Sequence, residues 1–267
     1  MTAIKITSIA DRPELAGRLW DMQDSWPEFS AHDSLAWLLY PRIVAEFPEY
    51  VWIATDGDAV VARGFSLPFA LHTAERAGAL PAQGWDAVLM WAFSDRRRGI
   101  RPDTVSAIEI SIATGRQGEG LSGRMLAAMR ESVRAAGFAE LVAPVRPSGK
   151  PAEPDTPMSE YAYRTREDGL PYDPWLRVHV RAGAVIDSVA PLSMTINGSL
   201  AQWREWTGLP FDTRGPIRVP GALAPVHCEP EHGYAVYVEP NVWVRHPLGA
   251  PAPDQSSATG AVAEEAV

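Results

Sequence analysis

Residues 107–126 read AIEISIATGRQGEGLSGRML, and this stretch decides the fold of the chain. Its first seven residues place isoleucine at every second position, which predicts a buried strand. Apolar residues then recur every fourth position from 121 to 133, which predicts an amphipathic helix that ends at Gly137. The stretch therefore predicts a strand, a glycine-rich turn and a helix in direct succession.

The glycine-rich turn predicts a binding site for an anion. Unpaired backbone N–H groups and the positive end of the helix dipole meet there, and glycine lets a phosphate approach the backbone. Gly118, Gly120 and Gly123 also fit the dinucleotide-binding spacing Gly-x-Gly-x-x-Gly. That motif needs an acidic residue at the end of the next strand, whereas Glu140 lies at the start of the next predicted strand. No Gly-Lys-Ser/Thr follows, so a P-loop is excluded.

Composition narrows the class of protein. The 267 residues carry a net charge of −9 with a pI near 5.2, which argues against nucleic acid and anionic membranes as partners. Cys228 is the one cysteine, so neither an internal disulfide nor a cysteine metal cluster is possible. No signal peptide or membrane-spanning apolar run is visible, so a cytoplasmic location is expected.

Metal and hydrolase chemistry are not expected. The six histidines are scattered, and no pair has the helical spacing of metal ligands. A Gly-x-Ser-x-Gly nucleophile elbow is absent.

Hydrophobic periodicity and capping signals predict the order β-α-α-β-β-β-α-β in the first part of the chain. The predicted strands are 4–9, 50–54, 60–67, 105–113 and 141–145, and the predicted helices are 11–22, 34–47 and 121–136. Asp11 is the expected N-cap of the first helix, and Asp56-Gly57-Asp58 is the expected hairpin turn.

Further elements are expected after residue 172. A helix 175–182 should be capped by Asp173, and a strand-like stretch covers 185–196. A capping box at 199–202 should open another helix, before short β segments at 217–219, 234–239 and 242–245. Two insertions, 68–104 with a helix at 85–97 and 146–172, either cap a substrate pocket or lie on the surface.

The glycine turn resembles the pyrophosphate-binding motif Gln/Arg-x-x-Gly-x-Gly/Ala of the GNAT superfamily of N-acetyltransferases. Gly118 and Gly120 occupy the two glycine positions, and Gly115 departs from the first position. The resemblance implies an α/β (α+β) fold with a mixed, largely antiparallel central sheet flanked by helices. It would cover residues 1–196, with a C-terminal extension at 197–246 packed on this domain and a disordered tail at 247–267.

The resemblance further implies an acyl-CoA-dependent N-acyltransferase without a metal. Acetyl would pass from acetyl-CoA to an amine of a small molecule, by direct attack in a ternary complex. The turn 115–122 would hold the pyrophosphate, and the backbone of the preceding strand would polarise the thioester carbonyl. The implied cofactor-binding residues are Ser111, Ile112, Ala113, Arg116, Gln117, Gly118, Glu119, Gly120, Leu121 and Ser122.

Catalytic candidates come from the same comparison and from the residues themselves. The family often has Tyr-x-x-x-Gly-Phe, with the tyrosine meeting the departing thiolate, and His179 stands at the tyrosine position here. Tyr161 and Tyr163 are the other candidate acids. Glu109 is the candidate base, because a carboxylate inside an apolar strand is costly to bury without a role. The alternative is that Glu109 pairs with an arginine on an adjacent strand or helix.

Two other functions remain open at this point. One is a non-catalytic GNAT-like module that binds CoA or a metabolite, since Gly115 and His179 both depart from the family pattern. The other is transfer of a different acyl group. Neither nucleic acid nor a membrane is an expected partner. The oligomeric state is unknown, and a dimer is possible.

Overall fold

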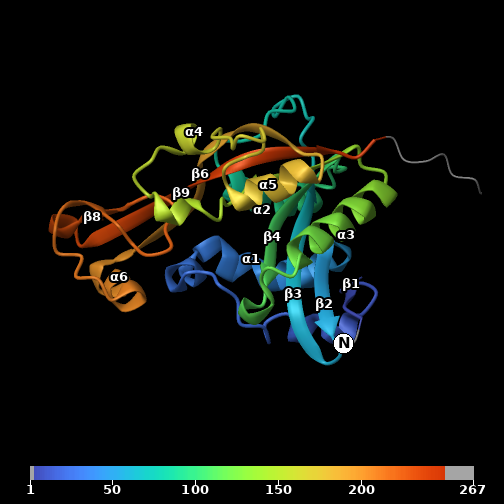
Figure 1. Ribbon diagram of the computed structural model, residues 1–267, viewed down its shortest axis with the longest axis horizontal. Coiled ribbons are helices and arrows are strands. Elements are labelled where there is room, and N and C mark those ends of the chain that lie inside the picture. Colours follow the sequence, from blue (N-terminus) through green and yellow to red (C-terminus); the bar gives the residue numbers. More distant parts are fainter. Residues whose placement is uncertain (1–2, 250–267) are drawn as a thin grey trace, which may run out of the picture.

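The computed structural model describes residues 3–249, and Figure 1 shows a central sheet with helices on both faces. The order of its nine strands is β1-β2-β3-β4-β5-β9-β8-β7, with β6 paired to β9. The strands are β1 Lys5–Ser8, β2 Val51–Asp56, β3 Ala59–Phe69, β4 Thr104–Ile112, β5 Glu140–Val145, β6 Val185–Ser199, β7 Gly215–Ile217, β8 Val226–Glu229 and β9 Tyr234–Pro247. Among the strands of residues 3–249, only β4 and β5 pair in parallel, which confirms the predicted mixed, largely antiparallel sheet.

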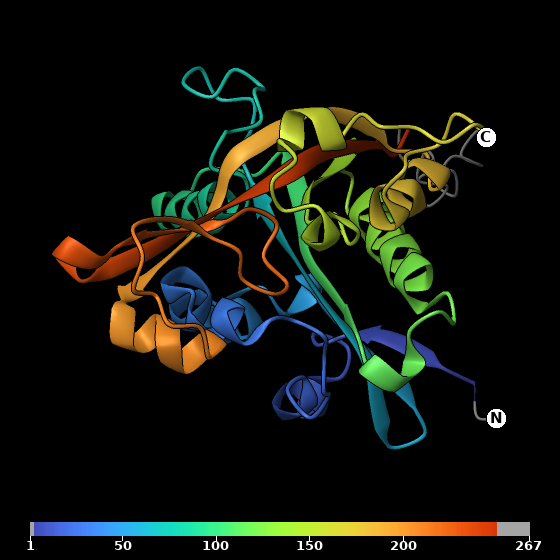
Figure 2. The same cartoon turned by 60° about the vertical axis from the view of Figure 1, so that its left-hand side comes forward.

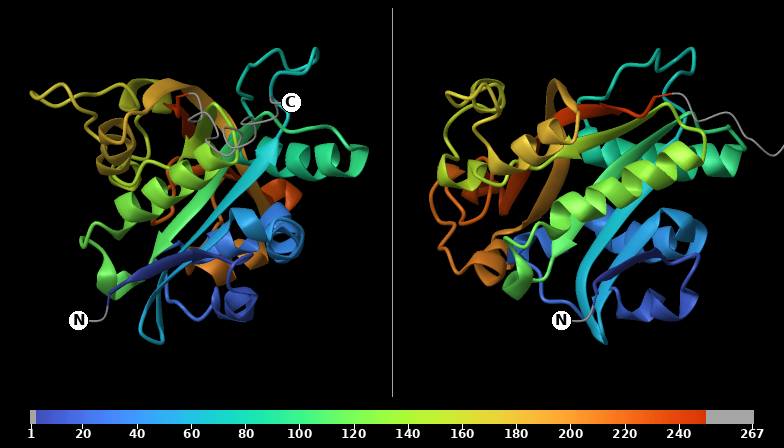
Figure 3. Two further views of the ribbon diagram at one scale, coloured as in Figure 1. Left: turned by 90° about the vertical axis from the view of Figure 1, so that its right-hand side faces the viewer. Right: turned by 45° about the vertical axis from the view of Figure 1, so that its right-hand side comes forward.

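Helices lie on the two faces of this sheet. Figure 2 shows α3 on one side of the strands and α1 on the other, and Figure 3 shows α5 beside α3 in both of its views. The helices are α1 Ser34–Glu46, α2 Gly84–Arg98, α3 Leu121–Ala135, α4 Met158–Tyr161, α5 Pro174–Arg181 and α6 Leu200–Thr207. Separate apolar clusters fill the two faces, one under α1 and α2 and the other under α3 and α5.

The decisive stretch folds as predicted. Strand β4 runs into the glycine turn, and α3 begins at Leu121 and buries the apolar stripe that includes Met125 and Met129. The helix cap at Asp173 and the capping box of Ser199 and Gln202 are also confirmed. In both cases a side-chain oxygen accepts hydrogen bonds from otherwise unpaired N–H groups of the first helical turn.

The helix expected at 11–22 is wrong. Residues 13–18 form a short 3₁₀ helix, and its N-cap is Arg12 with no side-chain hydrogen bond. Asp11 does not cap the helix, and its carboxylate instead accepts a 2.7 Å hydrogen bond from the hydroxyl of Ser8. Gly17 lies within the segment and further lowers its preference for an α-helix.

The C-terminal region differs from the expected short segments. The strands predicted at 234–239 and 242–245 are one strand, β9. Its second half lies between β5 and β6, and its first half pairs with β6 and β8. Strand β9 is thus part of the same sheet as β1 to β5. The domain boundary at residue 196 stays a prediction, and the predicted tail lies outside the described residues from 250 onward.

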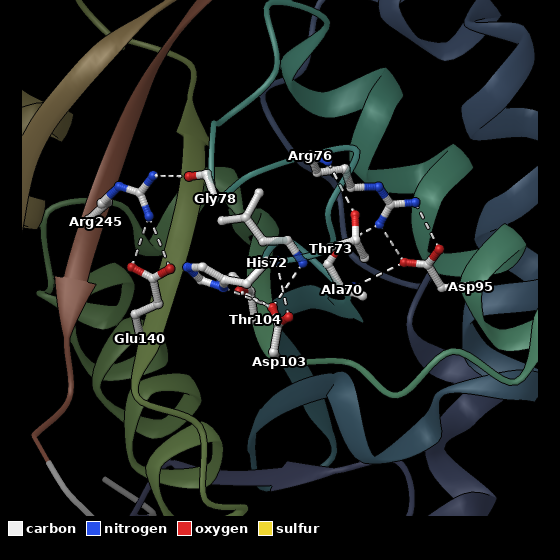
Figure 4. A network of polar contacts seen from close by, with 11 residues as sticks. Ala70, His72, Thr73, Arg76, Gly78, Asp95, Asp103, Thr104, Glu140 and Arg245 are labelled. Atoms are coloured by element: carbon white, nitrogen blue, oxygen red, sulfur yellow. Dashed lines mark hydrogen bonds and ion pairs between the residues drawn. The ribbon is translucent and has the colours of Figure 1, made fainter.

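Polar contacts fix the 68–104 insertion, as Figure 4 shows. Arg76 binds the buried carboxylate of Asp95 in α2 at 2.6 Å. Arg245 of β9 binds Glu140 of β5 at 3.0 Å and also donates to the carbonyl of Gly78 at 3.0 Å. The pair of Arg76 and Asp95 holds the loop that follows β3 against α2, and the hydrogen bond from Arg245 holds the same loop against β9.

Candidate functional site

A cavity of about 1140 Å³ runs through the sheet beside β4. Its walls come from the glycine turn and α5 on one face, and from α1 and the segment before it on the other. We call these parts the α3 side and the α1 side of the cavity. The size suits a ligand larger than a typical metabolite.

The glycine turn lines the α3 side with unused hydrogen-bond donors. Gly118 and Gly120 have φ values of 83° and 76°, a conformation that glycine adopts without steric penalty. The backbone N–H groups of residues 118–123 donate no hydrogen bond to other residues of the range 3–249. A Cβ added at either glycine would point into open space. The turn therefore offers free N–H groups at the N-terminus of α3, an arrangement that can hold an anion.

The charged side chains of the turn are already paired. Arg116 lines the cavity, but its guanidinium binds Asp56 at 3.0 Å and Glu119 at 2.8 Å. Gln117 donates to the hydroxyl of Ser25 at 3.0 Å. Glu119 does not line the cavity. The turn therefore offers an anion mainly its backbone N–H groups, beside the hydroxyl of Ser122, which also lines the cavity.

Strands β4 and β5 part next to this turn. They pair only at Val105 with Leu141 and at Ser106 with Val142, so β4 has no β5 partner from residue 107 onward. The ladder to β3 is also irregular, because Phe65 faces Glu109 and the next residue faces Ala107. Residues 107–112 of β4 all line the cavity.

Most of the predicted cofactor-binding residues of β4 and α3 line the cavity, but Ala113 does not. Ser111 and Ile112 line the cavity, as do Leu121 and Ser122 at the start of α3. Ala113 does not, and its N–H group already donates to the carbonyl of Val61 at 3.0 Å.

Aromatic rings dominate the α1 side. Trp20, Trp26, Trp37, Tyr40 and Trp85 all line the cavity there. The indole N–H of Trp85 donates to the carbonyl of Ile108, at the irregular point of β4, at 3.1 Å. Four of these five rings are tryptophans, so indole rings make up much of this cavity wall.

Glu109 lies on the α1 side, buried to 8% exposure within a polar network. Its carboxylate accepts from Arg63 of β3 at 2.8 Å and from Ser111 at 2.6 Å. Arg63 also binds Asp24 at 2.6 Å. Burial, with the nearby charge of Glu109, raises the pKa of Tyr40 well above its usual value. Both interpretations of Glu109 are thus compatible with the structure, because it pairs with an arginine and also lines the cavity.

A second buried ion pair lines the cavity and was not predicted. Arg146, directly after β5, donates to Glu239 of β9 at 3.0 Å, and Asn241 donates to the same carboxylate at 3.0 Å. Trp26 lies under the Arg146 guanidinium at 5.3 Å. A carboxylate inside an apolar strand singled out Glu109, and the same signal at Glu239 could have identified this pair.

His179 also lines the cavity, on the α3 side. Its Nδ1 lies 2.9 Å from Nε2 of His246 in β9, and both rings are buried. Burial lowers the pKa of His179 to about 3 and that of His246 to about 4, and the charge of Arg130 adds to both shifts. At neutral pH both rings are therefore uncharged.

The two candidate tyrosines lie away from the cavity. Tyr161 is buried under α5, and its hydroxyl donates to Asp173 at 3.0 Å. Burial, with the charge of Asp173, raises the pKa of Tyr161 and makes it a weaker acid. Tyr163 is 52% exposed at the surface. Of the four catalytic candidates, the structure brings Glu109 and His179 to the cavity.

The insertions contribute little to the cavity walls. Trp85 is the lining residue from 68–104, and Arg146 and Ser148 are those from 146–172. Lys150 instead fixes the second insertion, because its buried ammonium donates to the carbonyls of Glu153 and Leu223 at 2.6 and 2.7 Å.

Within residues 3–249, no group of three or more His, Cys, Asp or Glu side chains is placed to hold a metal ion. None of the helices in that range has the length and apolar character needed to cross a membrane.

Comparisons with known proteins bear on the family to which this chain belongs. No protein-family model matches the chain. The arginine N-acetyltransferase avaD of Aspergillus versicolor is 30% identical over 275 residues, which span 91% of this chain and 93% of avaD. The loading GNATL domain of CurA from Lyngbya majuscula superposes with a TM-score of 0.55 at 17% identity, over 92% of this chain and 98% of that domain. The second likeness concerns the fold alone, whereas the first extends over nearly the whole of both sequences. With the parted strands β4 and β5 and the glycine turn at α3, this establishes that the chain belongs to the GNAT superfamily of N-acetyltransferases.

Proposed function

We propose that this protein transfers an acetyl group from acetyl-CoA to an amine of a small molecule, with arginine as the first acceptor to test. The name of the Aspergillus relative supports arginine, and membership of the superfamily supports acetyl-CoA. The cytoplasmic location stays a prediction from the sequence.

One observation carries this proposal: the cavity joins an anion site to a buried carboxylate through the gap between β4 and β5. Acetyl transfer needs a donor held by its phosphates, a thioester carbonyl near the sheet and an amine arriving from the other face. The α3 side offers the free N–H groups of residues 118–123. The α1 side offers Glu109 within a wall of aromatic rings. The cavity therefore has room and suitable groups for both substrates.

Four groups of the chain would each take a separate part in the acetyl transfer. The N–H groups at the start of α3 would hold the pyrophosphate of acetyl-CoA, which supplies the activated acyl group. Backbone N–H groups of β4 that lack a β5 partner would polarise the carbonyl. Glu109 would accept a proton from the incoming ammonium, directly or through water. The neutral ring of His179 would donate a hydrogen bond on the side of the departing sulfur.

The acceptor side favours a positively charged molecule. Asp24, Glu28, Glu109 and Glu239 all contribute carboxylates to the lining, and Arg63 and Arg146 neutralise part of this charge. Aromatic rings such as Trp37, which is 78% exposed, can stack on a planar cation such as guanidinium.

Calorimetric titration with acetyl-CoA and with CoA tests the donor site. The parent should bind in the micromolar range, and Gly118→Trp should lose binding because the indole would fill the space before the N–H groups. Gly99→Trp is the matched control, since Gly99 also has a positive φ of 66° and open space but closes α2 outside the cavity. Absence of binding at millimolar acetyl-CoA would contradict the proposal, as would equal loss in both variants.

The acceptor is tested by following release of free thiol from acetyl-CoA. Arginine and related cationic amines should support turnover, and neutral amines of similar size should support less. Binding of acetyl-CoA without turnover on any amine would favour the non-catalytic module instead.

A further inference from the structure

His179 and His246 form a buried side-chain contact, and the family pattern has a tyrosine at the position of His179. His179 Nδ1 and His246 Nε2 lie 2.9 Å apart, and the side chains are 2% and 0% exposed. The ring centroids are 5.1 Å apart with a tilt of 49°. Since β9 carries His246 and α5 carries His179, the contact also joins a helix to the sheet.

One hydrogen bond between two neutral imidazoles allows two arrangements. Either His246 donates from Nε2 and His179 accepts at Nδ1, or His179 donates from Nδ1 and His246 accepts at Nε2. In the first arrangement His179 carries its proton on Nε2, and in the second His179 Nε2 is bare. The surroundings of the remaining nitrogens decide between these tautomers.

The environment of His246 Nδ1 favours the first arrangement. This nitrogen is fully buried and has no hydrogen-bond partner within residues 3–249. In the second arrangement it would carry a buried N–H group without an acceptor, which folded proteins rarely contain. Arg130 of α3 acts on both histidines as a nearby positive charge, and its own Nε is a buried donor without a partner. This positive charge disfavours a second proton on either ring, so both stay neutral.

The contact with His246 leaves His179 Nε2 as the nitrogen that can serve the cavity. Its Nδ1 is occupied by His246, so Nε2 is the ring nitrogen left for the cavity that His179 lines. Trp175, which also lines the cavity, packs against the His179 ring at 4.5 Å between centroids and restricts its rotation. A proton on Nε2 would therefore point a donor of fixed direction into the α3 side.

We propose that His246 is a positioning residue that donates its Nε2–H to His179 Nδ1, and thereby fixes the tautomer of His179 whose Nε2–H faces the cavity. The catalytic part of this proposal, the role of His179 toward the departing sulfur, rests on the proposed function. His179 stays neutral and transfers no proton. It stabilises, by a hydrogen bond, the negative charge that develops on sulfur when the electron pair of the C–S bond leaves with it.

Two-bond ¹H–¹⁵N NMR of the ¹⁵N-labelled protein at pH 7 tests the tautomers without any substrate. Both rings should be neutral and protonated at Nε2, with His179→Phe and His246→Phe supplying the assignments. A proton on Nδ1 of His179, or a doubly protonated ring, would overturn the proposal. This result is independent of whether the protein proves to be an acetyltransferase.

Kinetics then separate positioning from a merely structural role. His246→Phe should lower kcat about tenfold and leave the KM for acetyl-CoA unchanged, whereas His246→Gln, whose amide can donate from a similar place, should retain most of the activity. In a His179→Phe background, His246→Phe should have no further effect on kcat. An equal loss in both backgrounds, with thermal unfolding shifted to the same extent, would reduce His246 to a packing residue.

Discussion

Glu109 places a carboxylate where the cavity passes from one face of the sheet to the other. Its ion pair with Arg63 and the hydrogen bond from Ser111 fix the carboxylate, and the lining of the cavity leaves it accessible to a ligand. A buried carboxylate that is both held and accessible suits a general base better than a purely structural pair.

Glu109→Gln should lower kcat by about a hundredfold or more, because the amide cannot accept a proton from the amine. The KM for acetyl-CoA should change little, since Glu109 lies on the α1 side. Steady-state kinetics with saturating acetyl-CoA measures both effects.

Glu140→Gln is the matched control for this substitution. Glu140 is also a strand carboxylate paired with an arginine, Arg245 at 3.0 Å (Figure 4), but it is not among the residues that line the cavity. Its variant should keep kcat. If Glu109→Gln retained the parent's kcat and lost only stability, the pairing with Arg63 would be its whole role.

At the scale of elements, α2 illustrates a conflict between local and tertiary effects. Asp86 lies in the first turn of α2, where the helix dipole favours an ionised carboxylate. Burial has the opposite effect and, with the charges of Asp33 and Glu239, raises the pKa of Asp86 to about 7. One carboxylate oxygen is buried without a partner.

This shift gives stability a defined dependence on pH. The folded protein holds a proton on Asp86 up to about pH 7, whereas the unfolded chain releases it near 3.8. The contribution of Asp86 to stability is thus fully present below pH 3.8 and lost as pH rises through 7. Asp86→Asn, neutral throughout, should gain roughly 1–2 kcal/mol on the parent between pH 5 and pH 8, a figure discounted for the partial exposure of Asp86. Denaturant unfolding at the two pH values measures this gain, and a difference independent of pH would contradict the prediction.

Elements with strong local signals were predictable from the sequence. The isoleucines of β4, the apolar stripe of α3 and the caps at Asp173 and Ser199 all act within a few residues, and all are confirmed. The helix expected at 11–22 is a short 3₁₀ helix, and the carboxylate expected to cap it bonds to Ser8 instead. That competition depends on a side-chain contact that periodicity does not contain.

The candidate site was likewise predictable from the sequence only where its signals are local. The glycine turn and Glu109 were visible as local anomalies, a run of glycines and a charge inside an apolar strand. The pairing of His179 with His246 joins residues 67 positions apart, and that of Arg146 with Glu239 joins residues 93 apart. Both depend on where β9 enters the sheet, which no short-range pattern determines.

At the scale of the whole molecule, β9 fixes the position of β5 beside the cavity. Strand β5 pairs with β4 at only two positions, so its position depends on β9, which pairs with it from Glu140 to Val145. The same strand carries His246, Glu239 and Asn241, which line the cavity or support residues that do. Without β9, β5 would lose most of its hydrogen-bonded neighbours, and so would β6.

A chain that ends at residue 196, the boundary suggested by the sequence, tests this dependence. It should show no cooperative thermal unfolding and no binding of acetyl-CoA, because removing β9 exposes unpaired edges of β5 and β6 and the apolar faces beneath them. Circular dichroism during heating and calorimetric titration with acetyl-CoA measure the two properties. Co-expression with residues 197–267 should restore both, as expected if β9 can still insert between β5 and β6. Cooperative unfolding together with acetyl-CoA binding by the shortened chain would instead show that residues 1–196 fold by themselves, and that β9 only extends a sheet which already holds the cavity.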